Sequence, residues 1–233
     1  MADVADPRES RATAYTTLAR GPDSRHELEI KRSRFITVLR RTEDEESARS
    51  LVAGLRREFH DARHHCSAFV LGPDRDVQRS NDDGEPSGTA GIPMLEALIR
   101  RETVPGVTDL SDLSAVVVRY FGGILLGAGG LVRAYSESVS AALDLAPLVR
   151  RSRLRICAVE VDHAAAGRLE NDLRSAGFVM AETSYGAHNT MLRLALTDDQ
   201  REIAGAAERL ASMTSGRVGL RPEGTEWLDV PIA

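Results

Sequence analysis

A glycine-rich segment between a predicted strand and a predicted helix constrains this chain more than any other stretch. The β-branched run Leu113–Tyr120 predicts a strand, and the apolar pattern over residues 131–145 predicts a helix. The glycines between and beside them are Gly122, Gly123, Gly127, Gly129 and Gly130. Glycine reaches positive φ at low cost and lets backbone approach a partner closely. A strand, a glycine-rich turn and a helix start in this order predict a loop that binds an anion or packs closely against backbone.

The glycine-rich segment, residues 119–135, departs from three standard nucleotide loops. Gly122 and Gly127 have P-loop spacing, but Ala128 and Gly129 replace the lysine and the magnesium-binding hydroxyl. Gly127 and Gly129 fit a dinucleotide fingerprint, but Val132 stands where the third glycine is needed. The loop serines of galactokinase-type enzymes are missing as well. An anion- or backbone-binding loop is favoured, with close helix–strand packing as the alternative.

A second polar segment, residues 82–89, is called the acid loop below. It carries three carboxylates and two hydroxyls, on Asp82, Asp83, Glu85, Ser87 and Thr89. These carboxylates could hold Mg²⁺ beside a phosphate. They could instead form ion pairs with Arg119 and Arg133, which is the favoured interpretation and is compatible with arginines oriented toward a partner. Together with Tyr120 and the glycines, these residues form the candidate ligand- or nucleic-acid-binding site, with no catalytic residue, cofactor or metal predicted.

Histidines and a cysteine cluster just before this loop. His60 and His64 have the i, i+4 spacing that can share a zinc on a helix, and His65 and Cys66 follow. The run lies at a helix-to-strand junction, and adjacent strand residues point to opposite faces. Hydrogen-bonding and turn roles are therefore expected here, not metal binding or nucleophilic catalysis.

Charge and composition narrow the function classes. The formal net charge is -5, and neither half of the chain is basic. Contact with nucleic acid therefore requires a local basic patch. Arginine must supply almost all of that patch, because Lys31 is the single lysine. The basic run from Arg150 to Arg155 offers a weak supplement. Cys66 and Cys157 are expected to be reduced and buried. No apolar run approaches the ~20 residues of a membrane span, and the acidic N-terminus does not resemble a signal peptide, so a cytoplasmic protein without membrane contact is expected.

The first half predicts mixed strands and helices. Residues 27–39 read as one strand, and Thr42 with Glu45 as the capping box of a helix that ends near Phe59. Residues 66–71 predict a strand and residues 91–101 a helix. Residues 146–153, with Pro147 and the basic run, predict the linker between a first domain, 1–146, and a second, 153–233.

The second half predicts a strand–helix–strand–strand–helix–strand order. The expected elements are strand 153–161, helix 163–176, strands 178–185 and 189–196, helix 198–213 and strand 216–227. Gly177 is placed just past the first helix, and Thr197 with Gln200 as the cap of the second. This βαββαβ order is the split βαβ, or ferredoxin-like, unit. The chain is predicted to be an α+β protein of two domains.

Four segments resemble the IMPACT/YigZ family: residues 31–36, 62–66, 82–91 and 119–135, in family order. The resemblance implies a first domain with the fold of the second domain of ribosomal protein S5, shared with domain IV of elongation factor G. It implies a ferredoxin-like second domain similar to domain V of that factor. No settled activity comes with the bacterial branch. Eukaryotic relatives, linked to translation control under amino-acid starvation, carry a different extra domain, so their protein partner is not transferred.

Three functions compete on this basis. The leading hypothesis is a non-enzymatic protein of the translation apparatus that binds RNA or the ribosome through its glycine-rich and arginine-bearing loops. It rests on the family's fold likeness, which is associational, and on those loops. The second is an enzyme acting on a phosphorylated or nucleotide substrate at the same loops. The third is a regulator that binds another protein through an exposed surface.

Overall fold

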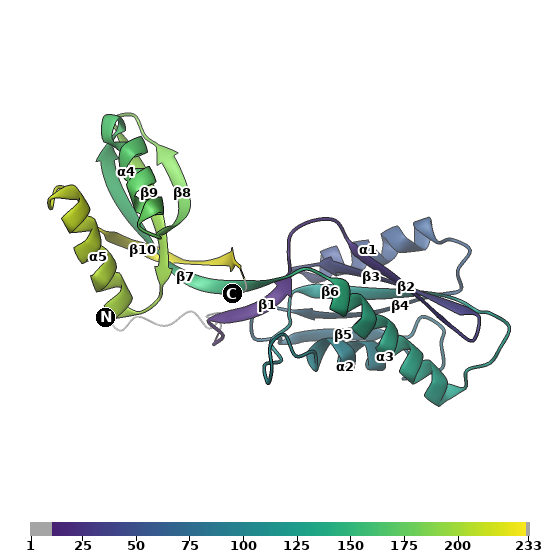
Figure 1. Cartoon of the computed structure of the whole chain (residues 1–233). Helices are drawn as coiled ribbons and strands as arrows, with labels where there is room; N and C mark the ends of the chain where they lie inside the picture. Colours follow the sequence, from purple (N-terminus) through teal and green to yellow (C-terminus); the bar gives the residue numbers. More distant parts are fainter. Residues whose placement is uncertain (1–10, 232–233) are drawn as a thin grey trace, which may run out of the picture. The chain divides into compact units, whose positions relative to one another are not determined.

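The chain forms two compact units joined by a continuous strand (Figure 1). The computed structural model describes residues 11–231. The first unit comprises Met1–Arg151 and Asp229–Ala233, and the second comprises Ser152–Leu228. Within the described residues, no helix combines the length and the apolar character that crossing a membrane requires.

The first unit is built on a five-stranded antiparallel sheet with the order β2-β3-β6-β4-β5. Its strands are β2 (Ser24–Ile30), β3 (Ser33–Arg41), β4 (His64–Leu71), β5 (Val77–Asn81) and β6 (Leu113–Tyr120). The β-branched run predicted as a strand is β6, which occupies the middle of the sheet and is buried on both faces up to Arg119. Continuous β-branched residues suit such a position because neither face of the strand meets water.

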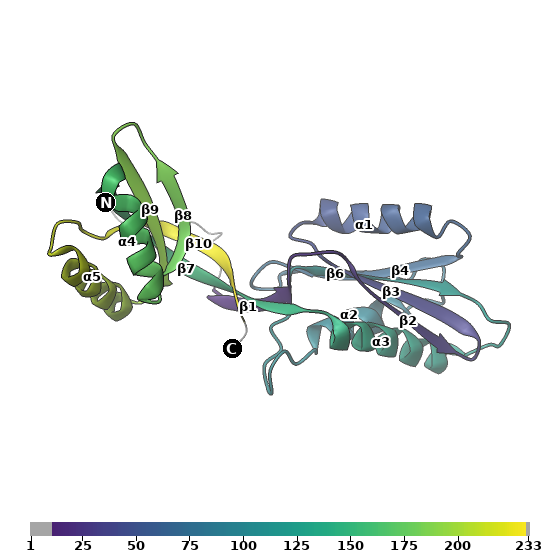
Figure 2. The same ribbon diagram turned by 45° about the horizontal axis from the view of Figure 1, so that its top comes forward.

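Helices cover both faces of this sheet (Figure 2). Helix α1 (Glu45–Glu58) packs its buried Leu51 and Leu55 against Val116 and Val118 on one face. On the other face α2 (Gly91–Ile99) and α3 (Ala128–Leu145) close the larger core, and Tyr135 lies fully buried within it. Strand β1 (Ala14–Leu18) pairs with β7 (Leu148–Asp162). Alternate residues of β6 belong to the two hydrophobic cores, so the end of this strand lies between two packed layers.

The strand predicted over residues 27–39 is instead two strands joined by a tight turn. Lys31 and Arg32 have φ values of +48° and +64°, and Ile30 pairs with Ser33 across the turn. Two successive residues with positive φ form the hairpin turn that matches strand twist. Lysine and arginine are not the residues that usually indicate this turn. The alternating sequence pattern therefore predicted one continuous strand where the chain turns.

Two helix starts also differ from the prediction. Asp44 caps α1 by accepting from the backbone N–H of Ser47, whereas the Thr42 hydroxyl bonds the Ser114 hydroxyl at 2.7 Å. Asp199 caps α5 (Gln200–Thr214) in the same way, two residues after the predicted Thr197. In both cases an aspartate next to the first helical residue reaches the free N–H groups better than the upstream threonine does.

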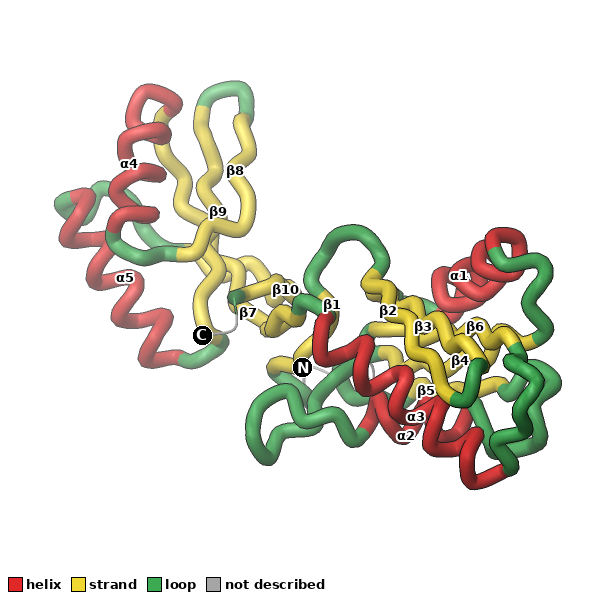
Figure 3. The backbone as a smooth tube through the Cα atoms, turned by 45° about the vertical axis from the view of Figure 1, so that its right-hand side comes forward, coloured by secondary structure: helices red, strands yellow, loops and turns green. Residues whose placement is uncertain are grey.

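The second unit has the predicted βαββαβ order: β7, α4 (His163–Ser175), β8 (Val179–Tyr185), β9 (Asn189–Thr197), α5 and β10 (Arg221–Val230). Alternate residues of two strands point into its core: Cys157, Val159 and Val161 of β7, and Leu192, Leu194 and Leu196 of β9. A period of two means that one face of the sheet is apolar, and both helices pack on that face (Figure 3). Gly177 follows α4 with φ +83°, as predicted.

The predicted linker over residues 146–153 is wrong in its conformation. Strand β7 begins at Leu148, and the Ala19 N–H donates to the Pro147 carbonyl at 2.9 Å. A proline and a basic run are typical of exposed loops, but proline also fits just before a strand, where no ladder hydrogen bond is lost. Both cysteines are free thiols and buried, as predicted.

Candidate functional site

Four segments meet at one end of the first sheet, called the basic end below. Arg34 at the start of β3 pairs with Tyr120 at the end of β6, and His64 at the start of β4 lies opposite Arg119. The β2–β3 turn, the glycine-rich segment, the start of β4 and the acid loop therefore lie side by side.

A buried ion pair joins the acid loop to the glycine-rich segment. Arg119 Nη1 donates to Glu85 Oε1 at 2.6 Å, and the two residues are only 6% and 8% exposed. The Tyr135 hydroxyl donates to the same oxygen at 2.8 Å. A buried charge requires such compensation, because leaving either partner alone in the interior costs several kcal/mol. The ion-pair interpretation is therefore right for Glu85 and Arg119.

Cys66 lies next to this ion pair, and its thiol is unreactive. Its Sγ lies 3.3 Å from the Tyr135 hydroxyl and 2.9 Å from the Asp82 carbonyl oxygen. Burial raises the pKa of the Cys66 thiol to about 12, and burial also raises the pKa of Tyr135. A thiol that stays protonated at neutral pH is a poor nucleophile and metal ligand.

Asp82 holds the acid loop together through backbone contacts. Its Oδ2 accepts from the Gly88 N–H, and its Oδ1 accepts from the N–H groups of Ala90 and Gly91 at 3.0 and 2.7 Å. Asp82 thus caps α2 from outside the helix. Burial opposes ionisation, but the three backbone donors outweigh it and hold the pKa of Asp82 below its usual value. This carboxylate has a structural task that the sequence did not reveal.

Asp83 docks the acid loop on its neighbours. Its carboxylate accepts from Arg56 of α1 and from the His65 N–H at 2.6 Å, and its carbonyl lies 2.9 Å from His64 Nδ1. Burial lowers the pKa of His65, which favours the neutral ring. Within residues 11–231 no group of His, Cys, Asp and Glu could hold a metal ion. His64 and His65 form hydrogen bonds, as expected.

The remaining polar predictions divide between buried and exposed. The Thr89 hydroxyl donates to the Pro86 carbonyl at 2.7 Å, while Ser87 is exposed. The Tyr120 hydroxyl donates to Asp61 at 2.7 Å, and the Arg34 guanidinium lies over the Tyr120 ring. Arg133 is exposed in the second turn of α3, three residues further along that helix than predicted, and does not join the acid loop.

The five glycines do different things. Gly122 packs so closely on the β2–β3 turn that a Cβ would lie 2.0 Å from the carbonyl carbon of Arg32. Gly123 and Gly127 have φ values of +85° and +71°, where only glycine is unstrained. Gly129 and Gly130 lie in the first turn of α3, and a Cβ on Gly129 would meet nothing within 4 Å. Packing thus explains Gly122, whereas Gly129 leaves open space beside the helix start.

Ala128 and Gly129 at the start of α3 are exposed, and no side chain within residues 11–231 caps this helix start. Around this end, several exposed cations make no ion pair with any residue of the described chain: Lys31, Arg32, Arg57, Arg63 and Arg133. Of these cations, the sequence pattern predicts only Arg133 as a site residue. The positive φ of the β2–β3 turn brings Lys31 and Arg32 here, and no local sequence signal marks that turn.

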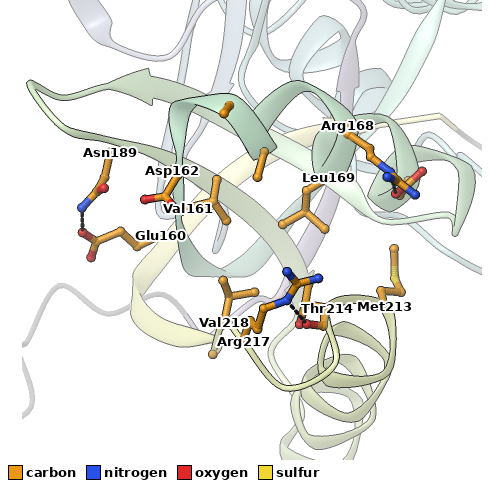
Figure 4. A pocket seen from close by; sticks show the side chains of 14 residues that line it. Glu160, Val161, Asp162, Arg168, Leu169, Asn189, Met213, Thr214, Arg217 and Val218 are labelled. Carbon is orange, nitrogen blue, oxygen red and sulfur yellow. Dashed lines mark hydrogen bonds and ion pairs between the residues drawn. The ribbon is translucent and has the colours of Figure 1, made fainter.

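The second unit contains a separate cleft of about 830 Å³ (Figure 4). It lies between the start of α4 and the end of α5, and none of the predicted site residues lines it. Carboxylates of Glu160, Asp162 and Asp172 face the same space as Arg168 and Arg217. Arg168 lies 3.8 Å from Asp172, and Arg217 donates to the Thr214 carbonyl, so this mixed lining is largely satisfied by its own members.

Comparison with known proteins identifies the domain families to which the two units are similar. Residues 31–143 match the Impact N-terminal domain, and residues 159–217 match a domain of unknown function, DUF1949. The chain is 38% identical over 207 residues to the IMPACT family member YvyE of Bacillus subtilis, covering 89% of this chain and 91% of the relative. It is 39% identical over 194 residues to the IMPACT family member YigZ of Escherichia coli, covering 82% and 90%.

A crystal structure described as that of a hypothetical protein matches with a TM-score of 0.56 and 36% identity, covering 90% of this chain and 97% of the other. The sequence similarity spans both units and includes the acid loop and the glycine-rich segment. The chain belongs to the IMPACT family, with an Impact N-terminal domain followed by a DUF1949 domain.

Proposed function

We propose that this protein is a non-enzymatic RNA-binding protein of the translation apparatus, which contacts structured RNA or the ribosome through the basic end. The observation that carries the proposal is a group of exposed cations that form no ion pair within residues 11–231: Lys31, Arg32, Arg57, Arg63 and Arg133. Many other arginines of the first unit are bound to carboxylates, for example Arg25, Arg40 and Arg41. Cations without acidic partners can release counterions from phosphate, the main source of affinity for RNA.

The backbone of the same region supports anion binding. The uncapped first turn of α3 presents N–H groups beside Gly129, whose missing side chain leaves that approach open. Arg119 is excluded from direct phosphate contact in this proposal because Glu85 and the surrounding core hold it. Its role is to join the acid loop to the sheet and so keep the phosphate-facing groups in place.

Fold likeness supplies the connection to translation. We assign the first unit to the fold of the second domain of ribosomal protein S5, and the second unit, Ser152–Leu228, to the ferredoxin-like fold. The βαββαβ order of the second unit supports the latter. Both folds occur in elongation factor G, so ribosomal RNA is the natural class of ligand, although fold alone does not establish function.

An enzyme acting on a phosphorylated or nucleotide substrate fits these contacts less well. Magnesium-assisted phosphoryl transfer requires carboxylates that are free to bind the ion. Asp82 is held by backbone N–H groups, Asp83 by Arg56 and the His65 N–H, and Glu85 by Arg119 and Tyr135. Each acid-loop carboxylate is therefore committed to the fold.

Salt-dependent binding tests the proposal. A labelled RNA hairpin and purified ribosomes are titrated with the protein at several salt concentrations, using wild type, Lys31→Ala and Arg133→Ala. Each substitution should weaken binding and reduce the slope of log affinity against log salt by about one. Arg100→Ala is the control, since Arg100 is an exposed arginine that lies 3.6 Å from Glu96. Equal behaviour of all four proteins would contradict RNA binding at the basic end.

A further inference from the structure

Phe121 is an aromatic side chain displayed at the basic end. It follows β6 directly and is 51% exposed, in a chain whose aromatic content is only 4%. Next to it Ile124 and Leu125 are 41% and 83% exposed. A single exposed ring is normal on a protein surface, but three exposed apolar side chains within five residues are typical of an interaction site.

The ring is the outermost member of a stack that starts in the core. The Arg119 guanidinium carbon lies 5.7 Å from the centre of the Phe121 ring and 5.5 Å from the centre of the buried Phe35 ring. Phe35 in turn meets Tyr135 edge to face, with ring centres 5.3 Å apart. Glu85 fixes one end of the guanidinium, while Arg119 Nε has no acceptor among the described residues, which leaves the arginine to interact with the aromatic rings.

The residues around the Phe121 ring indicate which class of ligand it binds. Gly122 packs on the Arg32 backbone, which places the Lys31–Arg32 turn next to Phe121. A flat, rigidly supported ring beside cations is the arrangement that binds single-stranded nucleic acid: a base stacks on the ring and its phosphates meet the cations. In a duplex the faces of the bases are covered by neighbouring base pairs, so the Phe121 ring cannot stack on them.

We infer that Phe121 is a stacking platform for an unpaired RNA base, with Lys31 and Arg32 contacting the adjoining phosphates. This inference rests on the proposed function and narrows its ligand from structured RNA in general to RNA that exposes an unpaired base. Phe121 is here a binding residue, and Arg119 is a positioning residue that supports the ring from below.

Three RNA probes of equal length test the inference: a labelled oligouridylate, the same backbone without bases, and a perfect duplex. Phe121→Ala should lower affinity for the oligouridylate by about tenfold and leave the other two unchanged. Phe121→Trp should restore the affinity, and its fluorescence should be quenched by the oligouridylate but not by the abasic strand. Leu125→Ala is the matched control, because Leu125 is exposed in the same loop but outside the stack.

The outcomes are distinguishable. If Phe121→Ala binds the oligouridylate as wild type does while Lys31→Ala still loses affinity, base stacking is wrong and the proposed function survives. If wild type retains none of these RNAs and no ribosomes, the proposed function fails as well. If Phe121→Ala and Leu125→Ala instead abolish, to the same extent, a nuclease-resistant complex with a protein, the loop is a protein-docking surface and the inference is overturned.

Discussion

The acid loop and the glycine-rich segment lie at the same end of one sheet, but they use their polar groups in opposite ways. In the acid loop, Asp82, Asp83 and Glu85 are each bound by donors of the protein itself. In and around the glycine-rich segment, the first turn of α3 is uncapped, and Lys31 and Arg133 make no ion pair within the described chain. The carboxylates of the acid loop are bound within the protein. The cations and backbone N–H groups around the glycine-rich segment remain available to a ligand.

The comparison teaches that polar residue types in a glycine-containing loop do not by themselves identify a binding site. What separates the two regions is whether each group already has a partner after folding. A carboxylate that accepts several hydrogen bonds stabilises the fold and is not available to a ligand. Substitutions in the acid loop should therefore destabilise the fold, whereas substitutions of the exposed cations should leave it intact.

Breaking the buried ion pair should have the largest effect. Glu85→Leu leaves the Arg119 charge buried without its carboxylate, and we expect a loss of about 3–5 kcal/mol in the free energy of unfolding. The double substitution Glu85→Leu with Arg119→Met should recover much of this loss, because no isolated charge remains. Chemical denaturation of both variants provides the measurement. As a control, Arg49→Ala removes an exposed pair with Glu45 and should cost less than about 1 kcal/mol.

Gly122 and Gly129 should respond oppositely to alanine. At Gly122 the new Cβ would meet the Arg32 backbone at 2.0 Å, so we expect a loss of about 3 kcal/mol. At Gly129 nothing lies within 4 Å and the residue is helical, so alanine should stabilise the protein by about 0.5 kcal/mol. Thermal melts separate the two. Similar melting temperatures for both variants would show that the close packing of Gly122 on the hairpin is wrong.

Removing the Asp82 charge should cost less and should depend on pH. Asp82→Asn weakens acceptance from three backbone N–H groups, for an expected loss of about 1–2 kcal/mol at pH 7. The folded-state pKa of Asp82 is lowered, so its contribution is fully present above the ordinary carboxyl value of about 3.9 and is lost as pH falls through the lower folded-state value.

The difference between wild type and Asp82→Asn should therefore stay constant from pH 7 to about 4 and shrink as the pH falls further. Urea denaturation at several pH values measures it, with Asp76→Asn, an exposed aspartate, as the control. A difference that grows in acid would contradict the capping role.

The smallest effect on stability should come from the cations of the basic end. Lys31→Ala and Arg133→Ala remove exposed side chains without ion pairs among the described residues, so stability should change by no more than about 0.5 kcal/mol. These are the same variants that should lose RNA affinity. If instead they unfold as readily as Glu85→Leu, the contrast between the two regions disappears.

Much of the fold could be read from local patterns. The β-branched run predicted β6 with its observed bounds, the apolar periodicity predicted the helices to within a few residues, and the second unit followed the expected βαββαβ order. Both helix caps in error, at Asp44 and Asp199, lay two residues from the predicted threonine. Such errors are small because periodicity determines a helix over many residues, whereas a cap depends on one side chain.

The site was only partly predictable. Residue types and spacing identified the acid loop and the glycine-rich segment, and they paired acids with arginines in principle. They could not assign Glu85 to Arg119 or Asp83 to Arg56, because residues far apart in the chain become neighbours only when β4 and β6 pair.

By itself, then, the sequence determined the family, the order of the elements in the second unit and the two segments that form the candidate site. Only the tertiary structure decided which polar groups the fold consumes and which remain exposed. The reason is physical: hydrogen bonds and ion pairs depend on distances below about 4 Å, and those distances are set by strand register and by turns such as Lys31–Arg32. No local pattern in this chain encodes either of them.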